Sequence, residues 1–412
     1  MLQRIKNLQD VVDWGLCLGC GACAYACQEK SVSLVNVEEV GIRPAFKQNC
    51  GTCNSCLAFC PGYSVDAYLA SGAPTNGNRA HDDFGSALEI WEGHATDPEV
   101  RFRGSSGGVL SALSLYCLER EGMGFVLHAA TDPEKPWLNK TVVSRTREEI
   151  LSRTGSRYAP ASPCEGLGRI EESDRPCVFI GKPSDAAATM RVRRERPKLD
   201  QNLGLVLTFF CAGEPSTKGT LDLIRDFQMV PSEVRSVRYR GEGWPGRFKV
   251  VSQTNEKSLT YQESWGKLTK YRAFRWQLDP DGMGRVADIS CGDAWEKFDS
   301  ESDAGRSIVL VRTERGRQIL QRAMTAGYVQ LWKAEPSNVI AGQPGLVQRR
   351  KEIFGRILGM KLLLVPTPKL KNFSLFRAWL TLPFQAKFRT VLGTMRRVIQ
   401  RGYWHRRPLR PV

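Results

Sequence analysis

Two cysteine runs near the N-terminus constrain this chain more than any other feature. Each run has the spacing C-x2-C-x2-C-x3-C. The first run consists of Cys17, Cys20, Cys23 and Cys27, and the second consists of Cys50, Cys53, Cys56 and Cys60. Three thiolates at this spacing on a tight loop reach three corners of one cubane iron–sulfur cluster. Two such runs predict a ferredoxin-like module with two 4Fe-4S clusters, which are electron carriers.

The fourth cysteine of each run has a particular role in a two-cluster module, because it ligates the cluster of the other run. We therefore expect two ligand sets, one made of Cys17, Cys20, Cys23 and Cys60 and the other of Cys50, Cys53, Cys56 and Cys27. Residues 31–46 have the alternation of a small hairpin, which would bring the two runs face to face. Gln28 stands where the first run usually carries a proline.

Structural zinc and disulfides are the alternative interpretations of these cysteines. Zinc prefers tetrahedral sites built from separated C-x2-C pairs, and the third thiolate of a triplet fits such a site poorly. The five other cysteines are scattered singly, and residues 1–13 lack the character of a signal peptide. This usage is typical of a reducing compartment. No stretch approaches the roughly 20 apolar residues of a membrane span, so we expect a cytoplasmic protein.

The region after the cysteine runs predicts a mixed fold with its own core. Apolar, strand-like segments alternate with helical patterns, and this alternation favours an α/β or α+β arrangement. The predicted strands are residues 125–130, 177–181, 203–210, 248–252 and 308–311. The predicted helices are residues 109–121 and 218–227, and residues 71–78 have the composition of a linker or loop.

The net charge of +16 is concentrated at the C-terminal end of the chain. Residues 353–412 contain 13 Lys and Arg and no Asp or Glu, which leaves +3 for the rest. Residues 384–399 predict an amphipathic helix with Phe384, Phe388, Val391, Leu392, Met395, Val398 and Ile399 on one face. Such a helix suits an anionic membrane surface or an acidic partner, and the alternative is a helix packed on the body. Nothing else in the chain predicts binding to nucleic acid.

Three loops have compositions that favour contact with a phosphate or a planar cofactor. Residues 103–108 (RGSSGG) precede a predicted helix, whose first backbone N–H groups attract anions. Residues 153–158 (RTGSRY) form a second basic loop, and residues 179–185 (FIGKPSD) follow a predicted strand. The plainer interpretations are a capped turn, a surface turn and an ordinary strand-to-helix junction. Among the carboxylates further on, Asp288 fits a structural role, while Asp293 fits a structural role or a cofactor contact.

These segments, in this order, resemble the coenzyme F-420 (deazaflavin) hydrogenase/dehydrogenase β-subunit family. The resemblance covers about residues 10 to 350. Besides the cysteine runs, its matching pieces are residues 104–108, 155–158, 181–183, 210–213, 239–245, 261–266 and 287–295. Two departures are visible. Ser184 and Asp185 replace a Cys-Gln pair found in many members, and residues 275–282 lack a cysteine pair. We therefore expect no third cluster and treat Cys211 and Cys291 as non-ligands.

The resemblance implies a bound FAD, which the chemistry of the residues alone does not predict. Its phosphates would lie near Ser105, Ser106, Gly107 and Gly108, with Arg157, Tyr158 and Lys182 as further contacts. The expected fold is α+β. It comprises a two-cluster ferredoxin-like domain (residues 1–70), a larger α/β flavin and substrate domain (residues 84–345) and a basic helical tail (residues 346–412).

The predicted function is an iron–sulfur flavoprotein oxidoreductase. Electrons from a ferredoxin or similar low-potential donor would pass through the clusters to FAD and on to an organic acceptor. The family suggests a deazaflavin, a tetrapyrrole or a polysaccharide-pathway substrate as that acceptor. The alternatives are a non-catalytic electron-relay subunit of a larger complex and an assembly factor with a degenerate flavin site. The catalytic residues stay unknown, because none of the four histidines has a recognisable catalytic setting.

Overall fold

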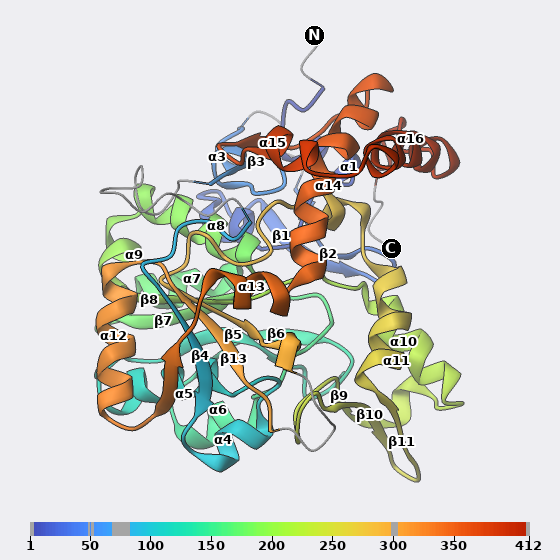
Figure 1. Ribbon diagram of the computed structural model, residues 1–412. Helices are drawn as coiled ribbons and strands as arrows, with labels where there is room; N and C mark the ends of the chain where they lie inside the picture. The colour runs from blue at the N-terminus through green and yellow to red at the C-terminus, as the bar shows by residue number, and fades with distance from the viewer. Residues whose placement is uncertain (1–3, 48–49, 51–52, 68–82, 298–303, 409–412) are drawn as a thin grey trace.

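The structure is a computed structural model that describes residues 4–47, 50, 53–67, 83–297 and 304–408 (Figure 1). The predicted linker at residues 71–78, together with Gly51 and His81, lies outside the described residues. No helix in the described part of the chain has the length and apolar character needed to cross a membrane.

The N-terminal segment that carries the cysteines is built from short elements. Its helices are α1 (Leu8–Asp13), α2 (Ala22–Ala26) and α3 (Cys56–Phe59), and its strands are β1 (Val32–Val37), β2 (Gly41–Phe46) and β3 (Ser64–Asp66). Strands β1 and β2 pair antiparallel from Val32 opposite Phe46 to Val37 opposite Gly41. The predicted hairpin is therefore confirmed.

A mixed sheet of eight strands, in the order β14-β4-β13-β12-β8-β7-β5-β6, forms the centre of the body. The strands are β4 (Glu89–Ala95), β5 (Val126–Thr131), β6 (Asn139–Ser144), β7 (Cys177–Gly181), β8 (Leu203–Phe209), β12 (Ile289–Asp293), β13 (Ser307–Val311) and β14 (Val329–Lys333). Neighbouring strands β12, β8, β7 and β5 run parallel, and the outer pairs are antiparallel. Four of the five predicted strands belong to this sheet.

Helices cover both faces of the eight-stranded sheet, as apolar central strands such as β7 and β13 require. The helices of the body are α4 (Pro98–Arg103), α5 (Val109–Glu119), α6 (Arg147–Ser152), α7 (Leu167–Glu171), α8 (Pro183–Val192), α9 (Pro197–Asn202) and α12 (Glu314–Thr325). Val178 of β7 packs in a core with α5 and α12, while Phe179 points to the other face and packs with α7, α8 and α9. Cys20 and Ala22 belong to this second core, so the cysteine segment packs directly on the body.

A smaller antiparallel sheet, in the order β11-β10-β9, lies beside the large one (Figure 1). Its strands are β9 (Val234–Arg238), β10 (Arg247–Ser252) and β11 (Glu256–Thr260), and they pack with α10 (Thr217–Asp226) and α11 (Tyr261–Leu268). The predicted strand at residues 248–252 is therefore confirmed as β10, in a separate sheet, and the predicted helix at residues 218–227 corresponds to α10.

The C-terminal segment returns to the cysteine segment. It contains α13 (Pro336–Gly342), α14 (Pro344–Leu362), β15 (Lys369–Lys371), α15 (Leu375–Leu380) and α16 (Phe384–Gln400). Strand β15 pairs in parallel with β3, and the backbone N–H of Arg407 donates to the carbonyl of Asp13 (2.9 Å). Figure 1 shows α14, α15 and α16 at the same end of the molecule as α3 and β3.

Candidate iron–sulfur and flavin sites

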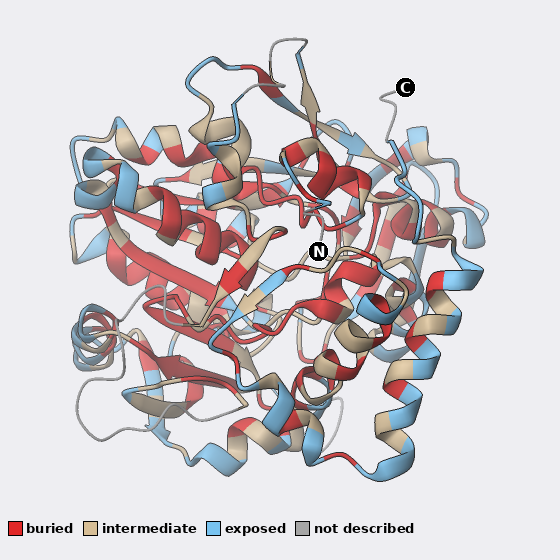
Figure 2. Ribbon diagram, turned by 90° about the horizontal axis from the view of Figure 1, so that it is seen from above, coloured by how far each residue is buried: buried red, intermediate tan, exposed pale blue. Residues whose placement is uncertain are grey.

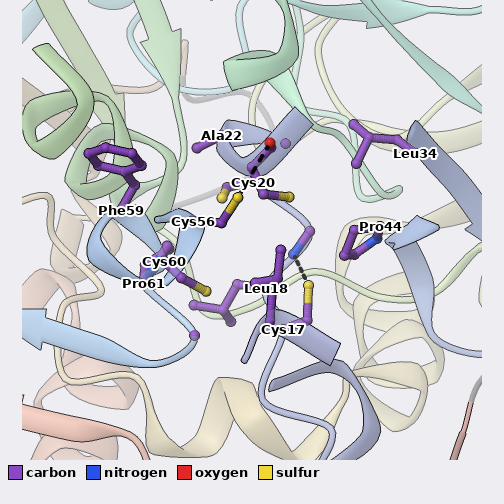
Figure 3. Close-up of a pocket in the computed structure, with 15 residues that line it drawn as sticks. Cys17, Leu18, Cys20, Ala22, Leu34, Pro44, Cys56, Phe59, Cys60 and Pro61 are labelled. Atoms are coloured by element: carbon purple, nitrogen blue, oxygen red, sulfur yellow. Dashed lines mark hydrogen bonds between the residues drawn. The ribbon is translucent and has the colours of Figure 1, made fainter. Parts of the chain in front are cut away.

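One cavity in the N-terminal segment is lined by cysteines from both runs (Figure 3). Cys17, Cys20 and Cys23 of the first run line it together with Cys56 and Cys60 of the second. The rest of the wall is mostly apolar and comprises Leu8, Leu18, Gly19, Gly21, Ala22, Leu34, Pro44, Phe59, Pro61 and Gly62. A site of this composition excludes water around the sulfur atoms, which is the environment in which iron–sulfur clusters are tuned.

The neighbours that act on several thiols follow the two ligand sets expected from the spacing. Burial, together with the neighbouring Cys17 and Cys20, raises the pKa of the Cys60 thiol to about 12. Burial likewise raises the pKa of Cys23, and Cys20, Cys17 and Cys60 add to that shift, as does Cys56 of the second run. We call this set, made of Cys17, Cys20, Cys23 and Cys60, the inner set.

The other four cysteines form what we call the outer set, made of Cys27, Cys50, Cys53 and Cys56. Burial raises the pKa of Cys56 to about 11, and Cys27, Cys50 and Cys53 contribute to the shift. Burial also raises the pKa of Cys50, with Cys27 and Cys53 as the next causes. The neighbours of Cys60, Cys56 and Cys50 agree with the grouping that the spacing predicts for two clusters, in which each set takes three cysteines from one run and the last cysteine of the other. Iron ligation itself stays a prediction.

Two glycines shape the first cysteine loop. Gly19 has a φ of +70°, and its N–H donates to the Sγ atom of Cys17 at 3.4 Å. Gly21 has a φ of +85°, and a Cβ atom there would lie 2.9 Å from the carbonyl oxygen of Ser162. A side chain at either position would be strained, and at Gly21 it would also separate the loop from the body.

The residues fit two iron–sulfur clusters on chemical grounds. Both sets supply four thiols, and backbone N–H groups donate to sulfur at Cys17 and also at Cys27, where the N–H of Ser31 lies 3.3 Å from Sγ. Thiols whose pKa is raised by burial need a bound cation to become thiolates, so metal binding releases protons. In the described part of the chain, no three His, Cys, Asp or Glu side chains are arranged to hold one metal ion.

The body of the protein supports the inner set with residues that sequence reasoning missed. The hydroxyl of Ser162 donates to the carbonyl of Gly19 (2.5 Å), and the N–H of Cys164 donates to the carbonyl of Cys20 (3.1 Å). A hydrogen bond from the Cys164 thiol lowers the pKa of Cys20. Cys164 is a single cysteine far from the two runs, so no sequence signal linked it to them.

Lys182, a predicted flavin contact, lies in a buried ionic cluster. Its Nζ atom is 3.0 Å from Glu214 Oε2 and 3.1 Å from Asp185 Oδ2, and it donates to the carbonyl of Ala161 at 2.7 Å. Burial alone would lower the pKa of Lys182, but the two carboxylates raise it above its usual value. Burial raises the pKa of Asp185 to about 6. The ammonium group of Lys182 is therefore held by groups of the protein itself.

The turn of Ser105, Ser106, Gly107 and Gly108 lies where β4 ends and β13 begins. The hydroxyl of Ser106 is 3.0 Å from Ser307 Oγ, which also accepts from the N–H of Gly107 at 3.0 Å. Gly108 adopts a left-handed conformation and caps α5. The Oγ atom of Ser105 accepts from the N–H of Ser156. The structure thus brings together the two loops that sequence reasoning singled out at residues 103–108 and 153–158.

Arg157 and Tyr158, on the second loop, point into the smaller sheet. Arg157 donates to the carbonyl oxygens of Pro136 (2.6 Å), Leu138 (3.1 Å) and Val237 (3.0 Å), so it ties the loop before β6 to β9. The ring of Tyr158 packs at 4.7 Å from that of Trp265. Both side chains are engaged in packing, and their contact with a flavin stays a prediction.

A buried pair, Arg240 and Asp293, joins the smaller sheet to the end of β12. Arg240 donates two hydrogen bonds to the Asp293 carboxylate, at 2.9 and 2.7 Å, and the indole N–H of Trp244 donates a third at 2.8 Å. The Arg240 guanidinium also lies over the rings of Tyr261 (4.7 Å) and Trp295 (5.2 Å), which stack on each other. Sequence reasoning left the role of Asp293 open and had no means to identify this partner.

Asp288, for which the sequence favoured a structural role, accepts from the N–H of Val206 (2.8 Å) and from the hydroxyl of Thr313. Both bonds tie β12 to its neighbours, so the structural role is confirmed.

Two family models match most of the body. The model described as "Coenzyme F420 hydrogenase/dehydrogenase, beta subunit N-term" matches residues 90–167, and the corresponding C-terminal model matches residues 174–337. Both cysteine runs precede these ranges.

Similar curated proteins carry related names. The chain is 26% identical over 266 residues to a coenzyme F420 hydrogenase subunit beta of Methanosarcina barkeri, covering 62% of this chain and 84% of that protein. It is 24% identical to an F420-dependent formate dehydrogenase 1 subunit beta of Methanococcus maripaludis, covering 61% of this chain and 63% of that protein. A coenzyme F420 hydrogenase subunit beta of Methanothermobacter thermautotrophicus is 22% identical, and the match covers 69% of this chain and 99% of that protein.

A solved structure shares the fold. A chain in the F420-reducing [NiFe] hydrogenase complex of Methanosarcina barkeri superimposes with a TM-score of 0.50 at 22% identity, covering 66% of this chain and 95% of that chain.

Proposed function

The chain belongs to the coenzyme F420 hydrogenase/dehydrogenase beta-subunit family, and from this premise we propose that it is an iron–sulfur flavoprotein oxidoreductase. Bound clusters would carry single electrons, and FAD would collect them and deliver an electron pair or a hydride. The proposed donor is a ferredoxin or a similar low-potential protein. The acceptor is an organic molecule, for which deazaflavin, a tetrapyrrole and a polysaccharide-pathway substrate are the candidates.

The gathering of cysteines from both runs around one apolar cavity is the observation that carries this proposal. Cys53 of the outer set is exposed, so an electron donor can approach that side of the module. Cys17 and Cys20 of the inner set are buried, and Cys20 belongs to the core of the body. Electrons that enter at the outer set would therefore pass to the inner set and on to the domain that matches the family models.

The residues of the body have distinct parts in this proposal. Ser162 and Cys164 hold the first cysteine loop against the body through its carbonyl groups. The backbone at Gly107 and Gly108 opens α5 and is the part best suited to flavin phosphates, because helix N-termini attract anions. Arg157 and Lys182 then act by holding the loops in place, since protein groups already engage their side chains.

A second candidate function is that of an electron-relay subunit in a larger oxidoreductase. The names of the relatives favour it, because each is a beta subunit of a hydrogenase or a formate dehydrogenase. Turnover of a small acceptor by the purified chain supports an enzyme that acts alone. Activity that appears only after addition of a partner subunit supports the relay.

The direct test is anaerobic purification with iron, sulfide and flavin measured on the same sample. The proposal predicts about eight irons per chain, as two 4Fe-4S clusters require, and one FAD. Eight irons without flavin, even after incubation with FAD, would contradict the flavoprotein and leave the relay. Zinc in place of iron would overturn both functions.

A further inference from the structure

Helix α16 packs on the molecule through a narrow polar and small-residue face. Thr390, Thr394 and Val398 are its buried side chains and repeat every fourth residue. A Cβ atom at Gly359 of α14 would lie only 2.6 Å from the carbonyl oxygen of Val391, so the two helix backbones approach closely. The helix therefore packs on the rest of the chain, but the packing uses few of the large apolar residues that were expected to form one face.

Four large apolar side chains of α16 remain on the surface. Phe384 is 72% exposed, Phe388 51%, Leu392 58% and Ile399 50%. We call these residues the α16 stripe. Their spacing of four, four and seven residues places them along one line of the helix, about a third of a turn from the packed face. Phe376 and Leu380 of α15 are also about half exposed. Figure 2 shows exposed and intermediate residues along most of the helix at the edge of the molecule on the right.

The segment that carries the α16 stripe is strongly basic. Residues 353–412 contain 13 Lys and Arg and no Asp or Glu. Arg389 and Arg396 are exposed, and their positions on the helix lie next to the stripe on the side away from α14. An apolar stripe bordered by cations is the arrangement of helices that lie in the surface of an anionic bilayer. The stripe extends over about 22 Å, given the rise of roughly 1.5 Å per residue.

We propose that the α16 stripe is a docking surface for an anionic phospholipid membrane. Charge complementarity decides between possible occupants. A second copy of the chain would bring two strongly basic segments together, which like-charge repulsion disfavours. A bilayer with anionic headgroups accepts the apolar side chains and also attracts the arginines.

Membrane docking would place the cysteine segment at the bilayer surface. Strand β15, which precedes α15 and α16, pairs with β3 just after Cys60, and Arg407 beyond α16 contacts Asp13 of α1. The docked helix and the two cysteine sets therefore belong to one end of the molecule (Figure 1). This inference does not depend on the identity of the cofactors or of the acceptor.

Sedimentation of the full-length protein with vesicles tests the inference. We expect binding to vesicles of phosphatidylcholine with phosphatidylglycerol and much weaker binding to phosphatidylcholine alone. The triple variant Phe384→Ser, Phe388→Ser, Leu392→Ser should bind anionic vesicles at least about tenfold more weakly, because it loses apolar area but no charge. Arg389→Gln with Arg396→Gln should weaken binding by about tenfold and reduce its dependence on salt.

Matched variants on the body control for loss of surface apolarity and charge. Val230→Ser with Trp332→Ser removes exposed apolar side chains, and Arg235→Gln with Lys257→Gln removes two exposed cations. Both controls should bind like the unmodified chain. Absence of binding to anionic vesicles, or unchanged binding by the triple variant, would overturn the inference. Self-association that the triple variant abolishes, without vesicle binding, would assign the stripe to a second copy instead.

Discussion

The inner and outer cysteine sets have the same spacing in the sequence but different surroundings in the folded chain. Cys17 and Cys20 of the inner set are each 9% exposed, whereas Cys53 of the outer set is exposed. The body reaches the inner set through Ser162 and Cys164. The comparison shows that the position of each set relative to the body, which the spacing does not encode, distinguishes the two sites.

The largest expected effect comes from removing one thiol of each set. Cys17→Ser and Cys53→Ser should each lower the iron content by about four atoms per chain. Cys17→Ser should also lower the melting temperature clearly more than Cys53→Ser, because an empty inner site leaves a cavity beside core residues. Iron analysis and thermal unfolding under anaerobic conditions measure both effects. Equal melting temperatures for the two variants would contradict the difference in burial.

A smaller effect is expected at Lys182, which separates two buried carboxylates close to the inner set. Lys182→Met should lower the free energy of unfolding by about 3–5 kcal/mol, because Asp185 and Glu214 lose their shared cation. The matched variant Lys267→Met breaks an exposed ion pair with Asp226 and should cost less than about 1 kcal/mol. Urea unfolding of the two variants compares them directly. Similar losses would show that the region behind the inner set is well solvated.

The pH dependence of the unfolding free energy should reveal the burial of Asp185, one of the two carboxylates beside Lys182. The pKa of Asp185 is about 6 in the folded chain, above the value of about 3.9 for an unfolded aspartate. The folded state then binds more protons between these values, so the contribution of Asp185 is complete below about pH 4 and is lost as the pH rises through 6. At neutral pH the loss amounts to about 3 kcal/mol.

Asp185→Asn isolates this contribution from those of the other carboxyl groups. The unfolding free energy of the unmodified chain minus that of this variant should fall between pH 4 and pH 7, because the contribution of Asp185 is lost as the pH rises. A difference that is independent of pH over this range would show that Asp185 titrates normally.

The smallest expected effect concerns the contact between the first cysteine loop and the body. Gly15 and Gly21 both have positive φ values, so alanine at either position costs about 1–2 kcal/mol. A Cβ at Gly15 meets open space, whereas one at Gly21 lies 2.9 Å from Ser162 O and 3.0 Å from Glu165 N. Gly21→Ala should therefore destabilise the chain more than Gly15→Ala in denaturant unfolding. Equal losses would indicate that the loop is not pressed against the body.

Much of the cysteine module could be predicted from the sequence, because its chemistry is local. Three thiols within seven residues restrict the backbone to a tight loop, and the alternation in residues 31–46 predicts the hairpin that the structure contains. Strand β7 was predicted with its observed ends, because a continuous apolar run is typical of a strand buried on both faces.

The surroundings of these elements could not be predicted, because they depend on contacts between distant segments. Strand β4 was missed, since Glu89, Glu92 and His94 interrupt its apolar pattern, although it pairs with β13 and β14. Lys182 and Arg157 are residue types that bind phosphate. In the folded chain, however, Lys182 forms an ion pair with Glu214, and Arg157 donates a hydrogen bond to the carbonyl of Val237. The apolar face predicted for α16 is divided, because Thr390 and Thr394 pack where larger side chains were expected.

The most direct test of the account asks which cysteines share a cluster. Cys17→Ser, Cys27→Ser, Cys53→Ser and Cys60→Ser would be purified anaerobically, reduced and compared by electron paramagnetic resonance. The account predicts that Cys60→Ser alters the same cluster signal as Cys17→Ser, and that Cys27→Ser alters the same signal as Cys53→Ser. Pairing of Cys27→Ser with Cys17→Ser, or the absence of iron–sulfur signals from the unmodified chain, would contradict it.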